Sequence, residues 1–342
     1  MTIDQIFKQF NRKYKKALVT GGAGFIGSHI CEELVMRGFP VVSIDDYSAG
    51  KKFNLKHLKK YKHFTEAKCD ITDSKKLVRY FKGVDVVFHN AASKKSVCLI
   101  NPLRDLEVNG GGAFNLLELA HKNKVKKFIH ASTGSVYGNA KYFPTDEEHP
   151  TNPVSYYGCS KLAAEKYVGI FNHLYGLNTT ILRYFHVYGN RQEFSDYGGV
   201  ISIFTSKIAE GQNPIIYGTG KQERSFTYVK DVVKANLLVA VADKTEGEIY
   251  NCASAIKITI NDLCKHMLKF FDRSDLKPKY GDWLVGDIKE FNINNSKIKK
   301  LGMDFTTDFY GQLDKILLDM KVYVNNAPKR HTPQTKKDFH RV

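Results

Sequence analysis

A glycine-rich turn between two apolar segments limits what this chain can fold into. Residues 20–28 read TGGAGFIGS and follow the apolar segment 17–19. Apolar residues then recur at helical spacing, at Ile26, Ile30 and Leu34. A strand, a glycine turn and a helix form the first half of a dinucleotide-binding βαβ unit, in which a pyrophosphate lies at the helix N-terminus. We therefore predict a dinucleotide site at this turn.

Each glycine of the turn has its own expected role. Gly21 allows the tight turn, Gly24 lets backbone amides approach a pyrophosphate, and Gly27 lets the helix pack close to the sheet. Phe25 and Ile26 lie between these glycines, and we expect them at the same site. A glycine turn without a ligand is the alternative. The strand, the helix and an acidic residue further along all favour the dinucleotide site.

The acidic residue in question is Asp45, which ends the second expected strand. A carboxylate there can accept hydrogen bonds from both ribose hydroxyls of an adenosine and repels a 2′-phosphate, which predicts NAD rather than NADP. Lys51 and Lys52 are a counter-argument because they could attract that phosphate. Asp70 and Ile71 leave the third expected strand, and we expect them beside the adenine.

Strands and helices alternate along the first half of the chain, which predicts an α/β fold with a doubly wound parallel sheet. The expected strands are 17–19, 40–44, 64–68, 84–88, 127–131 and 178–183. After Tyr188 this rhythm ends, which predicts a smaller C-terminal α/β cap. The expected parts are an amphipathic lead-in or loose arm at 1–14, an NAD-binding domain at 15–188 with 224–251 returning to it, a substrate-binding domain at 189–223 and 252–326, and a basic tail at 327–342.

The composition excludes several other classes of protein. Hydrophobic residues make up 42% and charged residues 25% of the 342 residues, which is typical of a globular enzyme. We find no segment that reads as a membrane span or a secretory signal. The six cysteines form no CxxC pair, so we expect reduced thiols and no metal site. These features predict a cytoplasmic enzyme that does not bind a membrane.

The net charge of +17 could indicate nucleic acid as a partner. The lysines are spread over several separate stretches and are not interleaved with aromatic residues, so a solvated lysine-rich surface is the better interpretation. We do not expect nucleic acid as a partner.

Tyr157 and Lys161 are the strongest candidates for chemistry. They lie one helical turn apart within 153–175, a segment expected to be helical, and therefore share a face. An ammonium lowers the pKa of a neighbouring phenol, and a phenolate can take a proton from a sugar hydroxyl as hydride leaves the carbon. Lys161 can also donate to the nicotinamide ribose. A solvated pair is the alternative, but a nucleotide fold and Ser132-Thr133 after the fifth strand favour catalysis.

In these motifs the sequence resembles the extended short-chain dehydrogenase/reductases, the family of NAD-dependent nucleotide-sugar epimerases and dehydratases, and among them the UDP-glucose 4-epimerases. The matching segments follow the order of the family and extend over about residues 20–290: 21–27, 70–71, 89–92, 132–138, 157–161, 182–189 and 224–229.

The resemblance implies roles for further residues. Thr133 would hydrogen-bond the reacting O4 of the sugar, and Tyr157 would be the base, assisted by Lys161. Ala91 and Ala92 would contact the cofactor. The remaining implied substrate contacts are Arg224 at the diphosphate, Val200 and Tyr217 at the nucleotide, Asp287 at a ribose, and Ser135 and His186 in the sugar and diphosphate pocket.

The sequence also departs from parts of the family. The 4,6-dehydratases carry Asp-Glu directly after the Thr, and the decarboxylases carry Glu at the second of these positions, where this chain has Gly134 and Ser135. These departures favour epimerisation, or simple oxidation and reduction at C4. His186 stands in place of the usual Asn and Leu284 in place of the usual Arg, so the sugar is left open.

The leading prediction is a UDP-sugar 4-epimerase that uses NAD and a 4-keto intermediate. The alternatives are a nucleotide-sugar 4-dehydrogenase or reductase, a 4,6-dehydratase-like enzyme, and a non-catalytic scaffold that binds NAD or nucleic acid. By the resemblance, we expect a homodimer in which helices at 102–123 and 153–175 pair.

Lys94 and Lys95 follow the fourth expected strand, in a loop that faces the nicotinamide and sugar in this fold. Two ammonium groups would attract a substrate carboxylate, such as that of a uronate, with Ser96 as a further donor. The alternative is that both lysines are surface charges.

Overall fold

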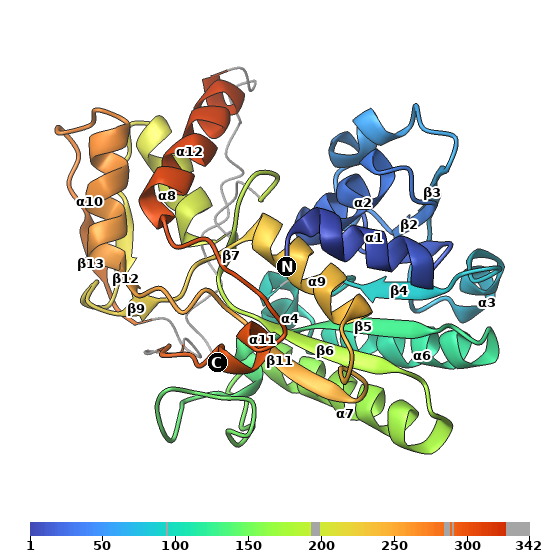
Figure 1. Ribbon diagram of the computed structural model, residues 1–342. Helices are drawn as coiled ribbons and strands as arrows, with labels where there is room; N and C mark the ends of the chain where they lie inside the picture. The colour runs from blue at the N-terminus through green and yellow to red at the C-terminus, as the bar shows by residue number, and fades with distance from the viewer. Residues whose placement is uncertain (94, 193–198, 284–287, 289–290, 326–342) are drawn as a thin grey trace.

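The computed structural model describes residues 1–93, 95–192, 199–283, 288 and 291–325 (Figure 1). Its centre is a seven-stranded sheet with the strand order β11-β6-β5-β4-β1-β2-β3, and every neighbouring pair is parallel. The strands are β1 Ala17–Thr20, β2 Val41–Asp45, β3 Phe64–Lys68, β4 Val86–His89, β5 Lys127–Thr133, β6 Thr179–Tyr184 and β11 Glu248–Cys252. The predicted doubly wound parallel sheet is confirmed.

The strand order reverses between β1 and β4, because the chain first adds β2 and β3 on one side of β1 and then crosses to the other side. In open parallel sheets a ligand binds at the carboxyl ends of the strands at this switch point. β11 pairs with β6 at the far edge of the sheet.

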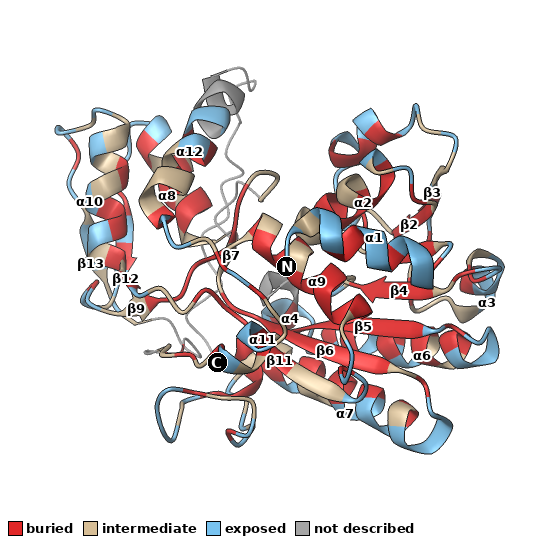
Figure 2. Cartoon of the chain, viewed as in Figure 1, coloured by how far each residue is buried: buried red, intermediate tan, exposed pale blue. Residues whose placement is uncertain are grey.

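Helices cover both faces of the sheet (Figure 1). One face carries α1 Ile3–Lys13, α2 Phe25–Met36 and α9 Val229–Val241. The other carries α3 Ser74–Leu77, α6 Gly112–Lys122 and α7 Tyr156–Tyr175. Consecutive strand residues divide between two hydrophobic clusters, so Val19 packs under α1 and α2 while Leu18 packs under α6 and α7. Figure 2 shows the resulting buried strands and half-exposed helices.

The N-terminal segment is not a loose arm. A capping box between Thr2 and Gln5 begins α1, and Ile6 and Phe10 bury its apolar stripe against the core. The hydroxyl of Tyr14 donates to the carbonyl of Ala240 at 2.6 Å, near the C-terminus of α9. The amphipathic alternative was therefore correct.

The two helices expected at 102–123 and 153–175 form with different boundaries. The first contains α5 Pro102–Leu106, a π-helical segment at Glu107–Gly111 and α6. The second begins only at Tyr156, because the side chain of Ser155 caps it by accepting from the amide of Gly158 at 3.1 Å.

The cap has its own core, to which α8, α10 and α12 contribute (Figure 1). Its elements are α8 Val200–Ala209, β8 Ile215–Tyr217, β9 Glu223–Arg224, β12 Ile258–Thr259, α10 Ile260–Phe270, β13 Lys279–Gly281 and α12 Phe309–Asn325. The smaller remaining elements are 3₁₀ helices at Lys52–Leu58, Val78–Tyr80 and Gly134–Val136, α4 Lys95–Ile100, β7 Val187–Tyr188, β10 Thr227–Tyr228 and α11 Ser296–Lys299. We propose the domain boundaries expected from the sequence on the basis of these separate cores.

Within the residues that the structure describes, no helix combines the length and the apolar character needed to cross a membrane.

Candidate active site

A cavity of about 330 Å³ lies at the switch point of the sheet, between the glycine turn and the start of α7. Every residue predicted to hold the cofactor lines it: Gly21, Gly24, Phe25, Ile26, Gly27, Asp45, Asp70, Ile71, Ala91, Ala92, Tyr157 and Lys161. These residues come from distant parts of the sequence, and the sheet brings them together because parallel strands end at one edge.

The turn needs glycine for reasons of space as well as conformation. Gly21 has a φ of +63°, and a Cβ there would stand 2.8 Å from the backbone of Ala91. A Cβ on Gly27 would stand 2.2 Å from the carbonyl oxygen of Gly21. α2 begins after Gly24 without a side-chain cap, so its first amides are available to an anion. This geometry fits a pyrophosphate.

Asp45 holds the same turn from the end of β2. Its carboxylate accepts hydrogen bonds from the amides of Ala23 at 2.9 Å and Tyr47 at 2.8 Å. Burial raises the pKa of Asp45, although these hydrogen bonds oppose the change. Each carboxylate oxygen keeps a second lone pair, so the group can still accept from ribose hydroxyls.

Asp70 organises the opposite wall of the cavity. It accepts hydrogen bonds from the amide and hydroxyl of Thr72 and pairs with Arg104. Burial alone would raise the pKa of Asp70, but the hydrogen bonds from Thr72 and Arg104 outweigh burial and lower it. Arg104 also lines the cavity, a role that sequence reasoning missed.

Tyr157 and Lys161 lie on the side of α7 that faces the sheet. Burial raises the pKa of Tyr157 to about 12, and Asp105 and Cys98 add to this rise. Burial lowers the pKa of Lys161 to about 8, against the influence of Glu165 and Asp105. The net shift of the Tyr157 pKa is therefore opposite to the lowering expected from Lys161, because burial of the phenol dominates.

A buried network holds the start of α7 in place. The hydroxyl of Ser160 donates to Asp105 at 2.5 Å, and the amide of Asn109 donates to Asp105 at 3.0 Å and to Ser160 at 2.9 Å. Asn109 also accepts from the amide of Ser93, in the loop after β4, at 2.9 Å. Sequence reasoning missed this network. A possible signal was the glycine run directly after Asn109, where the π-helical segment lies.

A second buried network lies one turn further along α7. Arg183 on β6 donates to the two oxygens of Glu165 at 3.0 and 2.7 Å, and Ser132 on β5 donates to Glu165 as well. Burial opposes the charge of Arg183, but its pairing with Glu165 raises its pKa. Because both partners are buried, removing either would leave an unpaired charge. The pair therefore fixes α7 against the sheet.

Thr133 ends β5 at the edge of the site. Its hydroxyl accepts from the amide of Ser135 at 3.1 Å and donates to the hydroxyl of Ser135 at 3.2 Å. Gly134 between them has no room for a side chain, because a Cβ there would stand 2.2 Å from the ring of Phe185. An acid at position 134 is therefore excluded while Phe185 keeps its place.

Of the predicted substrate contacts, the structure brings Arg224 and His186 together, beside Phe291. Arg224 is buried, with its guanidinium 5.3 Å from the ring centre of Phe291, and the His186 ring lies 4.7 Å from the same ring. His186 has a φ of +38°, which is a strained conformation for a residue other than glycine. Strain of this kind is common at functional sites.

The remaining residues predicted to contact the substrate either lie apart from the cofactor cavity or fall outside the described residues. Val200 begins α8 and is partly buried, and Tyr217 in β8 is 42% exposed. Neither lines the cofactor cavity. Lys94, Leu284 and Asp287 lie outside the described residues.

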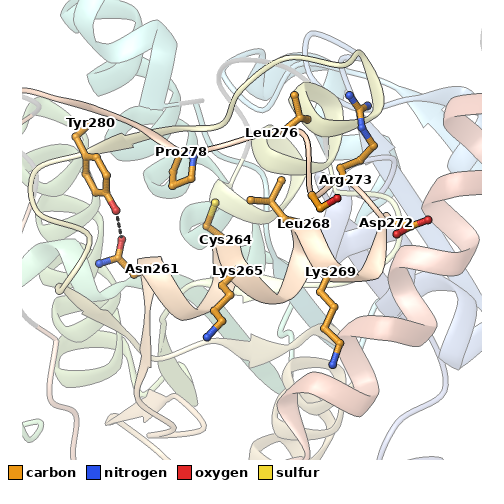
Figure 3. A pocket seen from close by; sticks show the side chains of 11 residues that line it. Asn261, Cys264, Lys265, Leu268, Lys269, Asp272, Arg273, Leu276, Pro278 and Tyr280 are labelled. Carbon is orange, nitrogen blue, oxygen red and sulfur yellow. Dashed lines mark hydrogen bonds between the residues drawn. The ribbon is translucent and has the colours of Figure 1, made fainter.

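A second hollow of about 510 Å³ lies in the cap, between α10 and the segment at 272–280 (Figure 3). The residues that line it include Cys264, Leu268, Leu276, Lys265 and Lys269, and the amino groups of the two lysines point away from Cys264. Burial raises the pKa of the Cys264 thiol to about 11, which makes it a poor nucleophile. The smaller cavity at the sheet is the one lined by Tyr157 and Lys161.

A doubly wound sheet with a glycine turn and a Tyr-Lys pair at its cofactor cavity is the arrangement of an extended short-chain dehydrogenase/reductase. A family model described as the NAD dependent epimerase/dehydratase family matches residues 17–253. The chain belongs to this family, and NAD is its cofactor.

Relatives of known name agree on the class but not on the reaction. A putative UDP-glucose 4-epimerase of Methanocaldococcus jannaschii is 40% identical over 313 residues, which are 89% of this chain and 98% of that protein. A UDP-N-acetyl-alpha-D-glucosaminuronate decarboxylase of Bacillus cytotoxicus is 38% identical over 264 residues, 73% of this chain and 78% of that protein.

A similar solved structure belongs to the same class of enzyme. The UDP-glucose 4-epimerase of Thermotoga maritima, determined with UDP-glucose, is 35% identical and has a TM-score of 0.85, with 90% of this chain and 99% of that chain covered. The comparisons therefore support an NAD-dependent enzyme of the nucleotide-sugar class and leave the reaction open.

Proposed function

We propose that this protein is a UDP-sugar 4-epimerase that works through a 4-keto intermediate. The observation that carries the proposal is the combination of a complete NAD cavity, a Tyr157–Lys161 pair within it, and no acid after Thr133. The lack of space at Gly134 strengthens the argument, because Phe185 leaves no room there for the acid that water elimination would need. Elimination is the step that separates dehydratases from epimerases.

In this mechanism Tyr157 takes the proton of the sugar O4 and later returns it. When bound, NAD would supply the hydride chemistry and a positive charge on its nicotinamide. That charge and the Lys161 ammonium favour the phenolate, which offsets the pKa of about 12 that burial imposes on Tyr157. Thr133 rotates its hydroxyl from Ser135 toward O4 and orients it.

The substrate side is built around Arg224. Its planar guanidinium suits bidentate binding of a diphosphate, and Phe291 supports it from one side. His186 shares Phe291 and stands where it can contact the same group. Val200 and Tyr217 would contact the nucleotide and Asp287 a ribose. Lys94 remains a proposed contact for a substrate carboxylate.

The test is product analysis on pure protein. UDP-glucose, UDP-N-acetylglucosamine, UDP-glucuronate and their 4-epimers are each incubated with the protein and followed by NMR. We expect at least one pair to reach the same epimer ratio from both directions with no net NADH. A 4-keto-6-deoxy product would contradict the proposal, and accumulation of NADH would identify a 4-dehydrogenase. Salt-sensitive RNA binding without turnover would identify a scaffold.

We also propose that the enzyme is a homodimer. The neighbouring helices α5, α6 and α7 expose large apolar side chains to solvent, including Leu103 at 66%, Ile170 at 48% and Leu174 at 61%. A second copy of the same helices would cover this surface with an identical one, as a two-fold interface requires.

The dimer is tested by sedimentation at micromolar concentration. Leu174→Glu should shift the protein toward monomer, whereas Leu318→Glu, at an exposed position of the cap, should not. A wild-type protein that sediments only as monomer would contradict the proposal.

A further inference from the structure

A row of polar side chains lies beneath Lys161 and has no role in the chemistry proposed so far. Thr20, His89 and His130 are register partners on β1, β4 and β5, and all three are buried. Register partners of a parallel sheet point to the same face. The three side chains therefore project together toward α7, which carries Lys161.

Contacts join the row at both of its ends. The hydroxyl oxygen of Thr20 is 2.8 Å from Nδ1 of His89, and Nζ of Lys161 is 3.4 Å from Nε2 of His130. The two imidazole rings are 5.0 Å apart between their centres. Their remaining nitrogens, Nε2 of His89 and Nδ1 of His130, have no hydrogen-bond partner among the residues that the structure describes.

The proton positions follow from Lys161. An ammonium can only donate, so Nε2 of His130 accepts and a neutral His130 carries its proton on Nδ1. The hydroxyl of Thr20 accepts from the amide of Ala91 at 3.2 Å and can donate to or accept from Nδ1 of His89, so this contact fits either neutral tautomer of His89. Burial and the charge of Lys161 hold the pKa of both histidines well below the usual range, so both are neutral.

The other charged groups near Lys161 already have partners. Glu165 on α7 is bound by Arg183 and Ser132, and Asp105 on α5 is bound by Ser160 and Asn109. Tyr157 also faces the cavity from α7. In the described part of the chain, His130 is the acceptor that lies within hydrogen-bond distance of Nζ of Lys161.

We propose that His130, supported by His89, is a positioning residue for Lys161. Its neutral imidazole accepts a hydrogen bond from the ammonium and holds this charge at the floor of the cavity. A neutral acceptor stabilises the buried ammonium of Lys161. A carboxylate in direct contact would also stabilise it, but would neutralise the positive charge that favours the phenolate of Tyr157. The proposal rests on the proposed role of Lys161 beside Tyr157.

The first test does not depend on any substrate. The full chain is labelled with ¹⁵N-histidine, and the signals of His89 and His130 among the 12 histidines are assigned with His89→Gln and His130→Gln. We expect both rings to stay neutral from about pH 5.5 to 8 and His130 to carry its proton on Nδ1. A His130 that titrates near its ordinary pKa, or that carries its proton on Nε2, would overturn the proposal.

The second test compares two substitutions at the same position. His130→Gln can place an amide oxygen near the position of Nε2, whereas His130→Leu offers no acceptor. Loss of a hydrogen bond to a buried ammonium lowers its pKa, so His130→Leu should move the alkaline limb of kcat down by about one pH unit. His130→Gln should restore most of that shift. NADH binding, measured by fluorescence, should change less than about twofold in both variants.

The matched control is His63→Leu, because Nε2 of the half-buried His63 contacts the carbonyl of Val35 at 2.9 Å and His63 does not line the cavity. It should leave the alkaline limb unchanged. An unchanged limb in His130→Leu, or a failure of His130→Gln to restore it, would assign His130 to packing alone. If no sugar nucleotide is turned over, the proposed function fails while the ¹⁵N measurement still decides the proton positions.

Discussion

The cofactor side and the substrate side of the site are built in different ways. Gly21, Asp45 and Ala91 stand at or just after the ends of buried parallel strands of four or five residues, inside one continuous sheet. Arg224 and His186 come from two-residue strands and connecting loops of the cap and its border. The difference indicates that the cofactor is specified by a rigid frame and the substrate by elements that can change without disturbing that frame.

The largest expected effect is at the point where both sides meet. Tyr157→Phe removes the phenolate oxygen that accepts the O4 proton, so kcat should fall by about a thousandfold, within the usual range for acid–base catalysis. NAD affinity should change little, because the ring remains in the cavity. Tyr156→Phe, at a neighbouring position that is 57% exposed, is the control and should keep full activity. A Tyr157→Phe enzyme with more than a tenth of the activity would mean another base.

The rigidity of the cofactor side predicts a large response to a single methyl group. Gly27→Ala places a Cβ 2.2 Å from the carbonyl of Gly21, so we expect NAD affinity to fall about a hundredfold, or about 2.7 kcal/mol. Isothermal titration measures this. Gly169→Ala on α7 has no atom within 4 Å of the added Cβ and should bind NAD normally. Equal NAD affinities in Gly27→Ala and Gly169→Ala would contradict the idea that the cofactor side is a rigid frame.

The substrate side should respond separately. Arg224→Lys keeps the charge but loses the planar fork, so the KM for the sugar nucleotide should rise about tenfold with NAD affinity unchanged. Arg273→Lys, on the outside of the cap where Arg273 pairs with Asp275, is the matched control. Parallel loss of NAD and sugar affinity in Arg224→Lys would show that the two sides are coupled.

The smallest effect is expected at the opposite end of the sheet. Burial lowers the pKa of Lys127 to about 7 from 10.5, while its ammonium group contacts Asn178 at 2.6 Å and Thr245 at 3.0 Å. Between these two pKa values the unfolded chain binds more protons than the folded chain, so the free energy of unfolding should rise with pH.

Lys127→Met should make that rise smaller, as measured by urea unfolding at about pH 7 and 9.5. Lys126→Met, at a more exposed position paired with Asp85, should leave the slope unchanged. An equal slope in wild type and Lys127→Met would contradict the assignment of the low pKa.

The fold and the cofactor cavity could be predicted because they depend on short-range patterns. The spacing from Gly21 to Gly27 and the acid at Asp45 are local, and the parallel sheet then brings them together. The sequence could not show whether residues 1–14 form an amphipathic helix or a loose arm. The burial of Phe10 depends on packing near α9, which lies far along the chain. The same holds for His89 and His130, which become neighbours only through strand register.

The pKa of Tyr157 shows a different limit. The sequence places Lys161 one turn away, but it does not show how deeply the phenol is buried or that Asp105 lies nearby. Likewise, nothing in the sequence near Gly134 indicates that Phe185, fifty residues later, occupies the space of its missing side chain.

That contact between Gly134 and Phe185 also limits how this chain could evolve toward another reaction. An acid at position 134 cannot be accepted first, because its Cβ would overlap the aromatic ring. A smaller residue at position 185 would have to come earlier, at the cost of a cavity beside Tyr137 and Phe291. The acid at position 134 would therefore need the change at position 185 before it, and that earlier substitution lowers the stability of the protein.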